Sequence, residues 1–165
     1  MTTLLTKGDF RIRVHDFAPE DKKEKYTDEK TLGFGQIFTD RMFYQEFKDG
    51  SWQEAQIKKF EPISLPPSSC IFHYAQEFFE GMKAYYHPNG DIALFRPEKN
   101  AKRFNSSATR LVMPHVNPEF FVWALEELVK LEKDWIPKTT KGASLDLRPT
   151  MIATESFLGV RPSAT

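Results

Sequence analysis

The feature that most constrains the fold is the tetrapeptide His87-Pro88-Asn89-Gly90, which lies between two β-prone runs. These runs are MKAYY before it and DIALF after it. An Asn-Gly pair between two such runs predicts a β-hairpin, because both central residues of a two-residue turn need a positive φ angle. We therefore expect an antiparallel pair of strands over residues 82–86 and 91–95.

Two helices are predicted after this hairpin. Pro97 suits the first turn of a helix that runs through NAKRFNSSATRL. Arg103 points away from the apolar stripe of that helix, which consists of Ala101, Phe104, Ala108 and Leu111. Asn117 and Pro118 are the expected cap and first residue of a second helix, which ends before Pro137. Its apolar positions are Phe121, Leu125, Leu128 and Trp135, and Glu126 is expected to pair with Lys130.

The rest of the chain reads mainly as strands. The run GFGQIFTDRMFYQEF predicts a hairpin around Thr39-Asp40-Arg41, and Asp49-Gly50 marks a turn before a strand in WQEAQIKKFEPISL. A short helix is expected over IFHYAQEFF, stopped by Gly81, and ASLDLRPTMIATE is β-prone with one break at Pro149. Hairpins, then helices, then more strand predict an α+β fold, a two-layer sandwich with a mostly antiparallel sheet and helices packed on one face.

Three segments are predicted along the chain. Residues 1–31 are a charged lead-in, of which residues 7–31 show no clear period and are expected to be solvated. Residues 32–158 form the folded domain. Residues 159–165 have the composition of a linker.

Composition excludes several classes of function. Lysine plus arginine and aspartate plus glutamate number 23 each among 165 residues, so no net charge attracts the chain to nucleic acid or anionic lipid. No apolar run is long enough to span a bilayer, and Met1–Lys7 is too short and polar for a signal peptide. The single cysteine, Cys70, rules out an internal disulfide and predicts a cytoplasmic protein. The chain has no HExxH, CxxC, P-loop or GxSxG motif, and its histidines lack ligand spacing, so no metal site is expected.

Five motifs occur in a collinear order between Phe34 and Pro162. They are FG..FTD.M, HYA.E.FEG.KAY, LFRP..N..R, the helix ending LEKDWIP, and the LRP…TE..LGV segment. In this order they resemble the small domain of the branched-chain amino-acid aminotransferases, which are pyridoxal-phosphate enzymes of fold type IV. The resemblance implies transfer of an amino group between leucine, isoleucine or valine and 2-oxoglutarate, with pyridoxal 5'-phosphate as cofactor and a homodimer as the full-length enzyme.

The resemblance also assigns roles to individual residues. It implies that Arg103 binds the cofactor phosphate, which suits a guanidinium that is always charged and can donate two parallel hydrogen bonds. Phe34, Tyr74 and Phe79 would line the pocket for the substrate side chain, and Tyr74 and Val160 would reach into the partner subunit's site. An ordinary surface arginine and plain core packing of the aromatic residues, Phe79 above all, stay open as alternatives.

Arg148 matches an arginine that accepts the side-chain carboxylate of glutamate in this family. Two residues earlier the family usually has tyrosine, whereas this chain has Asp146. Residues two apart on a strand share a face, so Asp146 is expected to pair with Arg148 and to weaken binding of glutamate or 2-oxoglutarate.

No catalytic residue is expected in this chain. In the family the lysine that holds the cofactor covalently lies beyond the point where this sequence stops. The lysines present are poor candidates, because Lys83 is expected to face solvent and Lys99 and Lys102 flank a helix turn. The chain alone is therefore predicted to be inactive. A D-amino-acid aminotransferase, an aminodeoxychorismate lyase, and a non-catalytic binding module that keeps the fold are the alternatives.

Overall fold

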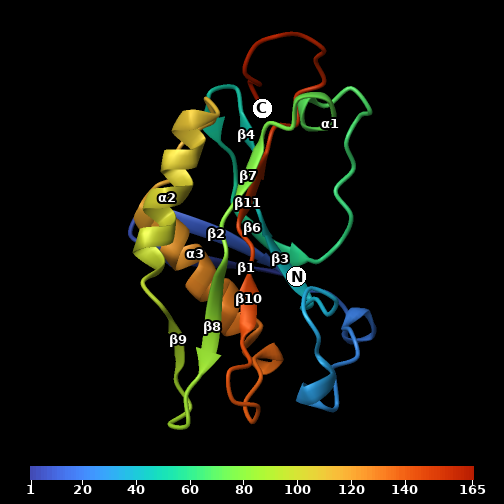
Figure 1. The fold of residues 1–165 in the computed structure, drawn as a ribbon, viewed down its shortest axis with the longest axis vertical. Helices are drawn as coiled ribbons and strands as arrows, with labels where there is room; N and C mark the ends of the chain where they lie inside the picture. The colour runs from blue at the N-terminus through green and yellow to red at the C-terminus, as the bar shows by residue number, and fades with distance from the viewer.

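The computed structural model describes residues 1–165 and confirms an α+β fold with mostly antiparallel strands (Figure 1). The largest sheet has the order β1-β2-β6-β3, and its only parallel pair is β2 with β6. Its strands are β1 (Thr2–Lys7), β2 (Phe10–His15), β6 (Gln56–Lys59) and β3 (Arg41–Tyr44). No helix is both long and apolar enough to cross a bilayer.

Three smaller sheets complete the strands. Their orders are β10-β8-β9, β11-β7 and β4-β5, and every pair in them is antiparallel. The strands are β4 (Phe47–Lys48), β5 (Ser51–Trp52), β7 (Glu77–Phe79), β8 (Met82–Tyr86), β9 (Ile92–Leu94), β10 (Leu145–Leu147) and β11 (Thr150–Ile152). Proline has no N–H to donate to a ladder, and Pro149 separates β10 from β11 as expected.

The two long helices begin at the prolines that the sequence marks, Pro97 and Pro118. The helices are α1 (Cys70–Tyr74), α2 (Pro97–Arg110) and α3 (Pro118–Leu131), with short 3-10 turns at Pro19–Asp21, Glu29–Thr31 and Lys133–Trp135. The Asn117 side chain accepts hydrogen bonds from the backbone N–H groups of Glu119 and Phe120, which satisfies two donors that have no partner within the helix.

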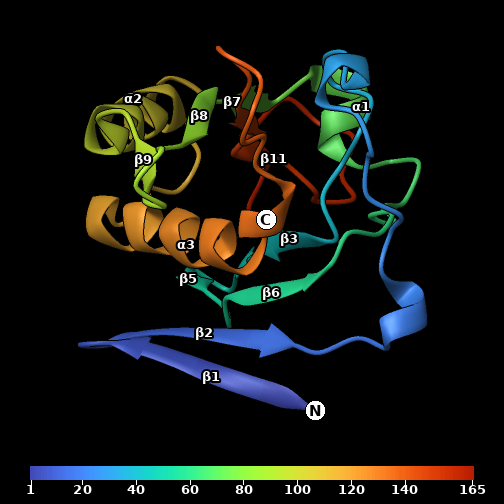
Figure 2. The ribbon, with the colours of Figure 1, turned by 90° about the horizontal axis from the view of Figure 1, so that it is seen from below.

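Helix α3 lies between two hydrophobic cores, because it presents apolar side chains on two faces. In Figure 2 its ribbon lies between α2 and β8 on one side and β6 and β2 on the other. Phe121 and Val129 belong to a core shared with α2, β8 and β10. Phe120, Trp123 and Ala124 belong to a second core, shared with β2 and β6. Strands therefore pack on two sides of α3.

The prediction of a solvated segment over residues 7–31 is wrong for β2. Its side chains alternate, and Ile12 and Val14 are buried in the second core. The alternation of FRIRVH is the period expected of a half-buried strand, but the charged residues between its apolar positions obscured it. Strand β2 is held between β1 and β6 rather than exposed.

The hairpin expected around Thr39-Asp40-Arg41 is also absent. Only the second of its two runs forms a strand, and that strand, β3, pairs with β6 instead. Asp49-Gly50 does form the turn between β4 and β5, because both residues have positive φ angles of 52° and 74°.

The helix expected over IFHYAQEFF is shorter than predicted. It ends at Tyr74, because Ala75 adopts the left-handed conformation, and the residues that follow form β7. Phe78 therefore lies on a strand, where its ring packs against Phe104 of α2 at 4.6 Å between centroids. Gly81 does not end this helix but lies between β7 and β8.

The hairpin of β8 and β9 is confirmed, although its turn differs from the expected one. Gly90 has a φ angle of 92°, whereas Asn89 is not among the residues with positive φ. The loop closes through His87, whose N–H donates to the carbonyl of Asp91, and through the N–H of Gly90, which donates back to the carbonyl of His87. On α3 the expected pair of Glu126 with Lys130 is replaced by Glu127 with Lys130 at 2.6 Å.

Candidate functional site

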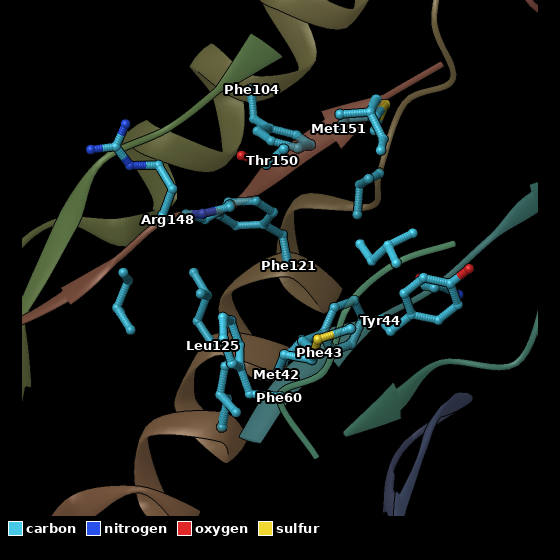
Figure 3. Close-up of a pocket in the computed structure, with 18 of the residues that line it drawn as sticks. Met42, Phe43, Tyr44, Phe60, Phe104, Phe121, Leu125, Arg148, Thr150 and Met151 are labelled. Atoms are coloured by element: carbon cyan, nitrogen blue, oxygen red, sulfur yellow. The ribbon is translucent and has the colours of Figure 1, made fainter. Parts of the chain in front are cut away.

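A large apolar cavity of about 1450 Å³ separates α3 and β3 from the segment that contains β10 and β11 (Figure 3). Figure 3 labels side chains around it from several parts of the chain. They are Met42, Phe43 and Tyr44 of β3, Phe60 just after β6, Phe104 of α2, Phe121 and Leu125 of α3, and Arg148, Thr150 and Met151 at β10 and β11. Arg148 is the charged side chain among those labelled.

A smaller pocket of about 470 Å³ shares lining residues with the large cavity. Its polar and charged lining residues are Lys83, Asn100, Asp146 and Arg148. Four residues line both spaces, and they are Phe34, Asp146, Leu147 and Arg148. The other lining residues of the smaller pocket are Gly81, Met82, Lys83, Tyr85, Phe95 and Asn100. Two residues predicted for the site, Phe34 and Arg148, are thus brought together here.

The alternation of β8 explains why polar side chains reach the smaller pocket. Met82 and Ala84 are buried in the first core, so Lys83 and Tyr85 point to the opposite face. Lys83 is directly opposite Asp146 of β10, and its Nζ lies 3.4 Å from the Asp146 Oδ1. The expectation that Lys83 simply faces solvent is therefore incomplete, because its ammonium group has a carboxylate partner.

The predicted pairing of Asp146 with Arg148 does not occur. Asp146 is paired with Lys83, and the Arg148 guanidinium lies over the ring of Phe79, with Cζ 4.3 Å from the ring centroid. A guanidinium over an aromatic face keeps its N–H groups available for a ligand, because the ring occupies its flat face. Arg148 therefore has no carboxylate partner within the structure.

Arg103 is held by a carboxylate that the sequence reasoning did not single out. Its Nε donates to Oε1 of Glu80 at 2.6 Å and its Nη2 donates to Oε2 at 2.7 Å, while Asn100 Nδ2 donates to Oε2 at 2.8 Å. Glu80 is only 2% exposed, whereas the Arg103 side chain is 69% exposed. Burial alone would raise the pKa of Glu80, but the hydrogen bonds from Arg103 and Asn100 outweigh it and the pKa is lowered.

Arg103 lines neither space, but a neighbour on the same helix connects it to the smaller pocket. Asn100, one turn before Arg103 on α2, lines that pocket and shares the Glu80 carboxylate. Glu80 itself is fixed by its backbone N–H, which donates to the carbonyl of Pro149 at 2.8 Å. The signal that could have revealed Glu80 was its place in the FEG run, since a glutamate between two aromatic residues and a glycine is unusual inside an apolar stretch.

Tyr74 and Val160 do not line either space. Tyr74 is the exposed last residue of α1, and Val160 is fully exposed in the C-terminal segment. That segment, red in Figure 1, runs beside α1, where the N–H of Cys70 donates to the carbonyl of Glu155 at 2.9 Å. The structure thus places Phe34 and Arg148 on the walls of both spaces and leaves Tyr74 and Val160 on an outer face. Phe79 contacts Arg148, and Arg103 is connected to the smaller pocket through Glu80 and Asn100.

The α+β fold has a counterpart among solved aminotransferase structures. It is similar to the Escherichia coli branched-chain amino acid aminotransferase, with a TM-score of 0.54 and 19% identity over 72% of this chain and 35% of the other. No family model matches the chain.

Sequence comparison finds relatives that share one enzyme name. The chain is 50% identical over 142 residues to branched-chain-amino-acid transaminase 1 of Bacillus subtilis, a match that covers 86% of this chain and 39% of the relative. It is 41% identical over 162 residues to branched-chain-amino-acid aminotransferase 2 of the same organism and 45% identical over 156 residues to the Dictyostelium discoideum enzyme. The chain is homologous to the branched-chain aminotransferases, which confirms the predicted resemblance, and it spans about 40% of the length of these relatives.

Proposed function

We propose that this chain is part of an enzyme that transfers an amino group between leucine, isoleucine or valine and 2-oxoglutarate. By the complete enzyme we mean a protein that contains residues 1–165 and also the further length that the relatives have. We propose further that residues 32–158, with β2 packed on them, are its small domain and that residues 159–165 begin a linker.

One observation carries this proposal beyond homology. Arg103 is held along one edge by Glu80 and is otherwise exposed, and the same carboxylate binds Asn100, which lines a pocket together with Arg148. Two guanidinium groups in this region suit a ligand set with two separate anionic groups, such as a phosphate and a carboxylate. Apolar walls from Phe34 and the adjoining cavity suit an aliphatic side chain.

The residues fit pyridoxal 5'-phosphate at its phosphate end. Arg103 has an unpaired Nη1 and would hold the phosphate, while Arg148 would receive the side-chain carboxylate of the acidic substrate. When bound, the cofactor supplies an electron sink for the bond that breaks at the substrate α-carbon. The chain's own contribution is to orient the phosphate and the substrate and to keep the side-chain pocket apolar.

Two further features belong to this proposal. Tyr74 and Val160 are exposed on the face that α1 and the C-terminal segment form, which supports a homodimer in which they enter the partner subunit's site. The free, buried Cys70 is consistent with a cytoplasmic location.

The substrates are tested by a screen on the complete enzyme. We expect transamination of leucine, isoleucine and valine with 2-oxoglutarate, and no comparable rate with D-amino acids or aminodeoxychorismate. Because Lys83 already pairs with Asp146, Asp146→Asn should leave kcat/KM for glutamate within about threefold, whereas Arg148→Ala should lower it by about tenfold or more. A large loss in Asp146→Asn would restore the hypothesis that this carboxylate controls Arg148.

Residues 1–165 alone are proposed to be inactive, because none of their lysines is placed to hold the cofactor. Lys83, at the pocket, is paired with a carboxylate. After incubation with pyridoxal phosphate and borohydride reduction, peptide mass spectrometry should find no stoichiometric adduct on any lysine of this chain. A single specific adduct, on Lys83 or elsewhere, would contradict the proposal.

A further inference from the structure

Glu80 is an unusual residue in this domain, because it is an acidic side chain buried almost completely. Only four polar or charged residues are buried in the chain, and they are Asp40, Ser69, Glu80 and Glu132. A buried carboxylate is stable only when its charge is paired and hydrogen-bonded. In this structure the partner, Arg103, comes from another element and remains 69% exposed on its outer side.

The geometry of the pair fixes one edge of the guanidinium and leaves the other free. Nε and Nη2 donate to the two oxygens of Glu80, so the plane of the group is defined by two parallel bonds. Nη1 makes no hydrogen bond, and Nη2 keeps one further N–H. These two nitrogens form a second edge that can donate in parallel to an anion.

Glu80 is itself held on both sides. Its backbone N–H donates to the Pro149 carbonyl, and its Oε2 accepts a second bond from Asn100 at 2.8 Å. The Glu80 carboxylate is therefore held in a fixed position and can hold Arg103 in turn. An exposed arginine without such a fixed partner samples many rotamers.

We propose that Glu80 is a positioning residue that orders Arg103, so that its free edge is ready for the phosphate monoester of the cofactor. This inference rests on the proposed function of Arg103. Glu80 has two opposing effects, because its negative charge repels a phosphate while its bidentate contact orders the arginine. Ordering is the larger effect, since the repulsion acts across an exposed, solvent-screened guanidinium.

The test compares pyridoxal phosphate with pyridoxal, which lacks the phosphate, by titrating the apo form of the complete enzyme and following tryptophan fluorescence. Glu80→Ala should raise the Kd for pyridoxal phosphate about thirtyfold, as expected from the rotamer freedom that an unheld arginine regains. The Kd for pyridoxal should change by less than about threefold. A purely structural role for Glu80 would move both constants equally and would overturn the proposal.

Three further variants make the result specific. Glu80→Gln keeps the volume and one acceptor, so it should fold like the wild type and raise the Kd for pyridoxal phosphate by about fivefold. Glu77→Gln changes an exposed glutamate of the same region and should leave both constants unchanged. Arg103→Ala should abolish the preference for the phosphorylated ligand, and Glu80→Ala should have no further effect in that background.

The outcomes separate this inference from the proposed function. If both Glu80 variants bind pyridoxal phosphate as tightly as the wild type, or more tightly, the positioning role is wrong even though the enzyme transaminates. If Arg103→Ala retains the phosphate preference, Arg103 is not the phosphate residue and the inference fails with it. If the cofactor results are as expected but leucine is not a substrate, the proposed reaction is wrong and the positioning role stands.

Discussion

A buried ion pair at the end of α3 should be one of the main determinants of stability in this domain. Glu132, the residue after α3, is 2% exposed, and its Oε1 accepts from Arg41 Nη1 at 2.8 Å. Its Oε2 accepts from the backbone N–H of Asp40, also at 2.8 Å. These bonds connect β3 to α3 at the wall of the large cavity, so their loss should destabilise the packing of the second core.

Glu132→Gln should lower the free energy of unfolding by about 3 kcal/mol. Removing one partner of a buried pair typically costs about 3 to 5 kcal/mol, because the remaining charge is uncompensated. Arg41 cannot readily find another partner for its charge. Its Nε is buried without a hydrogen-bond partner, and its Cζ lies 4.6 Å from the centroid of the Phe17 ring. The lower end of the range applies because the Arg41 side chain is still 17% exposed.

Urea unfolding followed by tryptophan fluorescence measures this change directly. Trp135 reports on the cluster, because its Nε1 donates to Asp40 Oδ2 at 3.2 Å. Glu127→Gln is the matched control on α3, since its partner Lys130 is 64% exposed, and it should cost less than about 0.5 kcal/mol. The Arg41→Gln, Glu132→Gln double variant should lose less than the sum of the two single losses. Additive losses, or a change below 1 kcal/mol for Glu132→Gln, would refute the reasoning.

Three other predictions concern stability and are checked by thermal or urea unfolding. Asn117→Ala removes the acceptor for two backbone N–H groups at the start of α3 and should cost about 1 kcal/mol, whereas Asn117→Ser should cost little. Ile57→Ala at a fully buried position of the second core should cost about 3 kcal/mol, and a loss below 1 kcal/mol would mean that this core is loosely packed. Glu29 accepts hydrogen bonds from the backbone N–H groups of residues 138–140, which lower its pKa from 4.5 to about 2. Because the folded pKa is the lower one, this stabilisation is complete above the unfolded value and is lost as the pH falls from 4.5 towards 2, so Glu29→Gln should flatten the pH dependence of stability in that window.

The elements that were predictable from sequence are those fixed by interactions within a few residues. Pro97 and Asn117-Pro118 mark the two long helices correctly, because a cap and a proline act on the first turn alone. The Asn89-Gly90 hairpin is local in the same sense. These signals do not depend on what the rest of the chain does.

The elements that were missed depend on partners far along the chain. Strand β7 forms because Glu77–Phe79 pairs with Thr150–Ile152, and nothing within EFF distinguishes a strand from the end of a helix. Strand β3 likewise pairs with β6 rather than with the run just before it. A local pattern shows which residues are apolar, but the pairing partner decides where the strand begins and ends.

The site shows the same limit at the level of single contacts. Spacing along one strand predicted that Asp146 would meet Arg148, since both were expected on one face. Residues two apart on a strand are separated by roughly 7 Å, whereas directly opposite residues on neighbouring strands lie at roughly 5 Å. The register places Lys83 opposite Asp146, and β10 ends at Leu147, so the nearer cross-strand partner prevails. Because Lys83 pairs with Asp146, the charge on Arg148 remains available for a ligand. Lys83 lies 65 positions before Arg148, so the LRP motif alone could not have predicted this.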